Sequence, residues 1–157
     1  MRISTKGRYS LRAMIDVAFY GKKRPVRLKE LADRTEISRN YLVQLFQQLK
    51  KAKLVKSVRG PTGGFVLTRP AKNITVKDIL SAVNESFTPV QCLEDSNGRK
   101  PLHDCSRFPD CVARNFWMKL KDKVEDFFEE TTLEELHQQA RSAYYKDVPE
   151  QDVDFSI

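Results

Sequence analysis

Residues 28–69 read LKELADRTEISRNYLVQLFQQLKKAKLVKSVRGPTGGFVLTR, and the spacing of apolar residues changes along this stretch. Steps of three and four predict a short helix at its start and a second helix that begins after Ser38 and continues to about Lys51. The Ser38 hydroxyl is suited to cap that second helix because it can accept from free backbone N–H groups. After Leu54 the pattern reads as a strand (VKSV), a turn (RGPTGG) and a returning strand (FVLTR).

Further helices are predicted on both sides of this stretch. Residues 6–20 carry apolar residues at helical spacing, and residues 74–85, ITVKDILSAVNE, do so again with Thr75 and Asp78 in a capping arrangement. Three helices followed by a hairpin is the order of a winged helix-turn-helix. We therefore predict a mainly α fold with a small β-hairpin, in which residues 1–85 form a winged helix-turn-helix DNA-binding domain.

The charges separate along the chain, which has 157 residues and a net charge of +7. Residues 1–80 hold 19 Lys and Arg against 5 Asp and Glu, whereas residues 81–157 hold 9 against 16, so the halves carry +14 and −7. The basic half indicates an anionic partner such as nucleic acid. Because there is no membrane-length apolar run and no apolar stretch in the opening MRISTKGRYS, we expect a cytoplasmic protein. An anionic lipid membrane is disfavoured as a partner, because the apolar helix faces of the basic half are expected to form a core.

The polar residues of the basic half favour double-stranded DNA as the partner. In the major groove Arg pairs with guanine and Asn or Gln with adenine, and the first turns of the third helix carry Ser38, Arg39, Asn40, Tyr41 and Gln44. At the hairpin tip we expect Arg59 to enter the minor groove, with close backbone approach allowed by Gly60, Gly63 and Gly64. Phosphate contacts are expected from Arg2, Lys6, Arg8, Lys51, Lys53, Lys56 and Arg69. RNA is disfavoured because no stacking-aromatic motif is present.

The second half predicts a loop over residues 86–110, then a long helix, a short helix and a tail. The long helix, about 30 Å in length, runs from Cys111 to Glu130 with an apolar stripe of Val112, Phe116, Leu120, Val124, Phe127 and Phe128. A second copy would bury this stripe, so we predict a homodimer formed by residues 111–145, with residues 146–157 as an acidic mobile tail. A two-fold dimer sets its recognition helices about 34 Å apart and so predicts a palindromic operator.

Three cysteines lie in or at the end of this loop. Cys92, Cys105 and Cys111 are separated by twelve and five residues. Thiolates suit iron–sulfur clusters and zinc, but the close cysteine pair of a structural zinc site is missing. The spacing alone leaves a metal, a disulfide and a reactive thiol open. An enzyme with Cys105 as nucleophile and His103 as base is disfavoured, since no third group that would orient the base is apparent.

Three motifs together resemble a known family: RISTKGRYSLRAMIDVA, ISRNYLVQLFQQLKKAKLVKSVRGPTGGFVLTRP and ITVKDILSAVNES. They are similar to the IscR, NsrR and CymR group of bacterial transcription regulators, the Rrf2 family, and the likeness resumes from CVARNFW to about Leu136. The resemblance implies a homodimeric winged-helix regulator, here expected to be a repressor, that senses an iron–sulfur cluster or redox status and controls iron–sulfur assembly or related genes. It also implies that Cys92, Cys105 and Cys111 hold the cluster, for which we favour 2Fe-2S and leave 4Fe-4S open.

The fourth ligand is where this sequence departs from the family pattern. Arg114 stands where IscR-like members place a histidine, and arginine stays protonated and cannot ligate. Arg8 stands where NsrR-like members recruit an acidic residue. His103 is our candidate, and the other open candidates are Glu94, Asp104, Asp110 and a residue of the other subunit. The alternative function is a cluster-free regulator of the same fold that responds to thiol oxidation or to a protein partner of sulfur metabolism.

Overall fold

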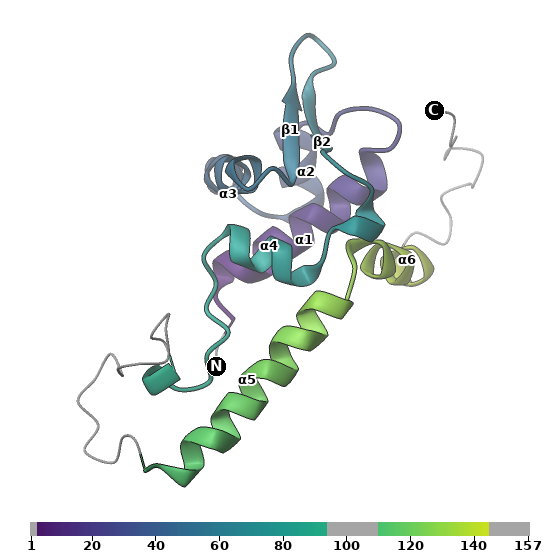
Figure 1. Cartoon of the computed structure of the whole chain (residues 1–157). Helices are drawn as coiled ribbons and strands as arrows, with labels where there is room; N and C mark the ends of the chain where they lie inside the picture. Colours follow the sequence, from purple (N-terminus) through teal and green to yellow (C-terminus); the bar gives the residue numbers. More distant parts are fainter. Residues whose placement is uncertain (1–2, 94–109, 145–157) are drawn as a thin grey trace.

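The computed structural model describes residues 3–93 and 110–144, which form a helical body with one long projecting helix (Figure 1). Its elements, in chain order, are α1 (Thr5–Tyr20), α2 (Leu28–Thr35), α3 (Arg39–Lys51), β1 (Val55–Val58), β2 (Gly64–Leu67), η1 (Ala71–Asn73), α4 (Val76–Ala82), η2 (Gln91–Leu93), α5 (Val112–Glu130) and α6 (Leu133–Tyr144). The predicted mainly α, winged helix-turn-helix fold with a small hairpin is confirmed. None of the helices described is both long enough and apolar enough to cross a membrane.

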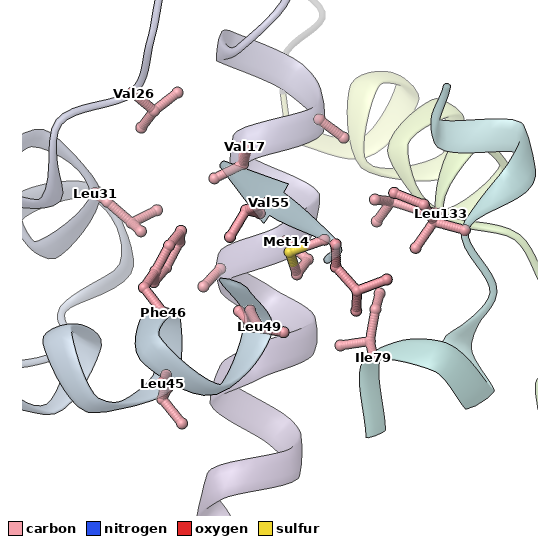
Figure 2. Packing of buried hydrophobic residues seen from close by; sticks show 14 of the residues in the cluster. Met14, Val17, Val26, Leu31, Leu45, Phe46, Leu49, Val55, Ile79 and Leu133 are labelled. Atoms are coloured by element: carbon pink, nitrogen blue, oxygen red, sulfur yellow. The ribbon is translucent and has the colours of Figure 1, made fainter. Parts of the chain in front are cut away.

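Helix α1 runs through the middle of the core. Its side chains Met14 and Val17 are buried because apolar residues recur on one helical face. Figure 2 shows them surrounded by core residues from α2, α3, β1, α4 and α6, among them Leu31, Leu45, Phe46, Leu49, Val55, Ile79 and Leu133. One core therefore fixes the helix-turn-helix, the hairpin and the last helix relative to one another.

Local signals set the starts of two helices as predicted. The Ser38 hydroxyl accepts from the Tyr41 backbone N–H at 3.4 Å at the start of α3. At the start of α4, the Thr75 hydroxyl accepts from the Asp78 N–H at 3.1 Å, and the Asp78 carboxylate accepts from the Thr75 N–H at 3.0 Å. This reciprocal pair is a capping box, which satisfies two backbone donors at once.

The hairpin is a two-stranded antiparallel sheet that is fastened to the loop before α2. Val55 pairs with Leu67 at one end and Val58 with Gly64 at the other. An isolated bridge joins Phe65 to Val26, whose N–H donates to the Phe65 carbonyl at 2.9 Å and whose carbonyl accepts from the Phe65 N–H at 2.8 Å. The wing is thus held to the body by backbone hydrogen bonds as well as by side chains.

The last described helix, α6, returns to the first helix. After α5, the Leu133 N–H donates to the Ile74 carbonyl at 2.8 Å, and Leu133 is fully buried in the core. Helix α6 then packs against α1, where the ring of His137 lies 5.4 Å from that of Phe19. Burial, with Lys22 nearby, lowers the pKa of His137, so this buried imidazole is neutral at pH 7. Within the predicted loop, Gln91–Leu93 form the short helix η2, and residues 94–109 lie outside the described residues, as does the predicted tail.

Candidate nucleic-acid interface

Helix α3 is anchored to the body by a turn that begins at the end of α2. Glu36 ends α2 in the left-handed region, with φ 57°, and Ile37 is buried behind it. The Arg34 guanidinium binds Asp16 of α1 through two hydrogen bonds of 2.8 and 2.7 Å, and it lies 4.0 Å from the centre of the Tyr20 ring. The hydrogen bonds to Asp16 raise the pKa of Arg34. They also hold α2 against α1, and so they restrict the position of the turn that leads into α3.

The predicted base-reading residues lie at the start of α3, and most of them are exposed. Ser38, Arg39, Asn40 and Gln44 face solvent. Tyr41 is half-buried instead, with its ring edge-on to that of Tyr9 at a centroid distance of 5.8 Å. The buried face of the same helix consists of Leu42, Leu45, Phe46 and Leu49. An α-helix with one buried face and an exposed face of Arg, Asn and Gln can enter a major groove while its back stays in the core.

The hairpin of β1 and β2 projects from the body on the side away from α5 (Figure 1). Its tip carries Arg59, which is exposed. Gly60 follows with φ +116°, a conformation that other residues rarely adopt. Gly63 closes the turn by donating its N–H to the Gly60 carbonyl at 2.9 Å. A Cβ on Gly64 would lie 2.5 Å from the Val26 carbonyl oxygen, so this glycine permits the bridge between wing and body.

Two hydrogen bonds that the sequence did not predict join the wing to the helices. Arg27 Nη2 donates to the Pro61 carbonyl at the wing tip at 2.5 Å, and Lys50 Nζ donates to Ser57 Oγ at 3.1 Å. Neither contact joins two residues of the same helix or strand, so helical or strand periodicity gives no signal for them. The Lys50 bond ties the wing to α3, and the Arg27 bond ties the wing tip to the start of α2, so the wing is held relative to the helix-turn-helix, as a two-element DNA contact needs.

The basic residues expected at phosphates have different surroundings. Arg8 is exposed and donates to Thr5 Oγ1 at 3.2 Å, Lys6 is half-buried, and Arg2 lies outside the described residues. Exposed lysines lie in and after the end of α3 and on β1, at Lys51, Lys53 and Lys56.

Arg69 differs from these residues because its guanidinium is engaged within the protein. Its Nε donates to the Asn73 carbonyl and its Nη2 to Asp78 Oδ2, both at 2.8 Å. The sequence suggested a phosphate contact for Arg69, whereas in the structure it joins the end of the wing to the capping box of α4.

Two of the three cysteines are described. Cys92 lies in η2 and Cys111 immediately precedes α5, and both are free and half-buried. Cys105 and His103, together with Glu94 and Asp104, fall outside the described residues; Asp110 is exposed. Within residues 3–93 and 110–144, no three His, Cys, Asp or Glu side chains are grouped closely enough to hold a metal ion. We call residues 92–111 the cysteine segment. The two described thiols lie at its two ends and have the sulfur chemistry that iron–sulfur clusters require.

Helix α5 exposes an apolar stripe along its length. The exposed fractions of Val112, Phe116 and Phe127 are 84%, 60% and 63%, and Leu120 is exposed as well. The neighbouring face of α5 contacts α4, since Lys77 Nζ lies 3.5 Å from Glu125 and 2.8 Å from Glu129. Hydrogen bonding to Glu129 raises the pKa of Lys77, consistent with a charged link between α4 and α5.

The chain matches the pattern of one protein family over most of its length. The family is Rrf2, described as an iron-dependent transcriptional regulator, and the match covers residues 3–139.

Individual relatives agree with that match. The transcriptional regulator IscR of Pectobacterium carotovorum is 41% identical over 136 residues, which are 87% of this chain and 79% of the relative. IscR of Vibrio atlanticus is 38% identical over the whole chain and 86% of its own length. Among solved structures, CymR of B. subtilis, titled the global cysteine regulator, has a TM-score of 0.73 at 36% identity and covers 88% of this chain and 98% of its own. The T. potens IscR structure has a TM-score of 0.70 at 35% identity, over 92% of this chain and 91% of its own.

Proposed function

Because this chain belongs to the Rrf2 family and is a DNA-binding transcriptional regulator, we propose that it acts as a homodimeric repressor on palindromic operators and responds to iron–sulfur or redox status. It is not an enzyme. The observation that carries the DNA contact is the polar face of α3, exposed at Arg39, Asn40 and Gln44 and anchored from behind by the core. A bacterial operator lies in the cytoplasm, so this is the compartment we assign.

The exposed stripe of α5 supports the homodimer. A single copy leaves Val112, Phe116 and Phe127 in water, and apolar side chains gathered along one helix mark an interaction surface. A second copy supplies the same stripe through a two-fold axis, which makes the contact self-complementary. Two copies of α3 about 34 Å apart would then meet successive major grooves and read two halves of a palindrome.

The cysteine segment supports the sensing role. We assign Cys92, Cys105 and Cys111 as the ligands of an iron–sulfur cluster, 2Fe-2S by preference and 4Fe-4S as the other form, with His103 as the fourth ligand. When bound, a cluster supplies sensitivity to oxidants and to iron supply. Regulated genes for iron–sulfur assembly or related processes would match a relative named IscR.

The contacts around α5 give this segment a route to the DNA-binding half. Cys111 immediately precedes α5, and Lys77 joins α5 to α4 through Glu125 and Glu129. Arg69 in turn joins α4 to the end of the wing through Asp78. A displacement of α5 would therefore reach the wing through the ion pairs of Lys77 and of Arg69, which supports a linkage between the cysteine segment and operator affinity.

A cluster-free regulator is the second candidate function. It is favoured by the likeness to CymR, whose solved structure is titled the global cysteine regulator and is covered almost completely by the match. In this case Cys92, Cys105 or Cys111 would respond to thiol oxidation, or the dimer would bind a protein partner of sulfur metabolism.

An anaerobic reconstitution distinguishes the two candidates. The full chain and a Cys92→Ala, Cys105→Ala, Cys111→Ala triple variant are incubated with iron and sulfide, and iron, acid-labile sulfide, visible absorption and operator affinity are measured. We expect the wild-type chain alone to retain iron and sulfide, to absorb in the visible, and to change its operator affinity. A colourless wild-type protein whose affinity equals that of the triple variant would rule out the cluster and leave the cluster-free regulator.

A further inference from the structure

One apolar side chain interrupts the polar face of α3. Val43 is 38% exposed, whereas the other apolar residues of this helix, Leu42, Leu45, Phe46 and Leu49, are buried. In the described part of the chain, the remaining exposed large apolar residues are Val58 on the wing and residues of α5, namely Met118 and members of the apolar stripe. Val43 is therefore set apart from both the core and the dimer surface.

Helical geometry places Val43 among the residues expected to read bases. It follows Arg39 by four residues and Asn40 by three, and it precedes Gln47, also exposed, by four. Residues three or four apart are neighbours on a helix surface. Single exposed valines are ordinary on protein surfaces, but this one lies inside the face that would enter the groove.

The chemistry of the major groove gives such a side chain one matching partner. Base edges there present hydrogen-bond donors and acceptors, and the C5-methyl group of thymine is the apolar group among them. Valine carries no donor or acceptor, so against any other edge it would leave a base group unpaired and remove water from it. When Val43 and a thymine methyl group are in contact, both apolar surfaces are removed from water, which favours binding.

We propose that Val43 contacts a thymine methyl group in each half-site and is a specificity-determining residue of this regulator. The inference rests on the proposed operator binding and adds a base preference to it. Arg39, Asn40 and Gln44 would supply the hydrogen-bonded readout, while Val43 selects thymine between the contacts of its neighbours.

The test removes the C5-methyl group of thymine and the methyl groups of Val43, first separately and then together. The operator is first recovered from a random duplex library by binding to the full-length wild-type chain. Each thymine of that operator is then replaced by deoxyuridine, which lacks only the C5-methyl group, and affinities are measured for wild type and for Val43→Ala. Alanine favours helix, so Val43→Ala is expected to fold, as thermal unfolding would verify. Val58→Ala is the matched control, because it removes the same methyl groups from the wing instead of α3.

At one thymine per half-site, we expect methyl removal to weaken wild-type binding about fourfold per half-site, or about fifteenfold for both. Val43→Ala should bind the thymine operator correspondingly more weakly and should be insensitive to the deoxyuridine replacement, whereas Val58→Ala should keep the wild-type sensitivity. Equal losses for wild type and Val43→Ala at every thymine, or an operator without thymine in its half-sites, would overturn this inference and leave operator binding intact. If no sequence were enriched at all, operator binding and this inference would both be overturned.

Discussion

Arg59 lies at the tip of the hairpin and Arg69 lies just after its second strand, and the two arginines have different surroundings. Arg59 is exposed at the wing tip, whereas Arg69 donates to Asn73 and Asp78 and so stabilises the start of α4. Sequence alone treats both as candidates for DNA contact, because a basic residue beside a strand gives no sign of a partner nine residues further on. The distinction depends on the fold, which brings the capping box of α4 to the end of β2.

These two arginines form a matched pair of variants. We expect Arg59→Ala to weaken operator binding by about 1–3 kcal/mol and to leave the melting temperature unchanged, because its side chain is exposed. Arg69→Ala should instead lower the free energy of unfolding by about 1 kcal/mol or less, since its ion pair is partly exposed. Titration of a labelled operator at moderate salt and thermal unfolding measure the two effects. Unchanged affinity for Arg59→Ala would contradict the wing contact.

At the scale of elements, the sequence predicts those features that depend only on residues close together in the chain, such as helix caps. The cap at Ser38 and the capping box at Thr75 and Asp78 are local, and both are present where the sequence places them. The return of α6 to α1 is not local, because Leu133 reads as an ordinary helical apolar residue until the fold brings it beside Ile74. The partners of Arg27 and Lys50 were missed for the same reason.

The apolar stripe of α5 leads to a prediction about the oligomeric state of the protein. If the proposed dimer forms through the apolar stripe of α5, Phe116→Glu should make the protein monomeric, because a carboxylate would have to be buried without a partner in that contact. Asn115→Glu introduces the same charge at an adjacent exposed position outside the stripe and should leave the dimer intact. Sedimentation velocity measures both. A dimeric Phe116→Glu protein would place the dimer contact elsewhere.

At the scale of the whole molecule, a basic half and an acidic half of the chain share one hydrophobic core. The charge of +14 belongs to residues 1–80, which include α3 and the wing, and the charge of −7 belongs to residues 81–157. Because Leu133 of α6 is buried in the core of the first half, α5 is fixed at its end to the body that carries α3 and the wing. The positions of the two recognition helices in a dimer would therefore depend on how two copies of α5 meet, which is how the proposed dimer would set operator spacing.

Selection of bound sequences from a random duplex library by the full-length chain tests this account most directly. We expect the enriched operator to be a palindrome whose half-site centres lie about ten base pairs apart, one turn of DNA. A single unrepeated motif would contradict the two-fold arrangement of α3, and the absence of any enriched sequence would contradict sequence-specific DNA binding itself.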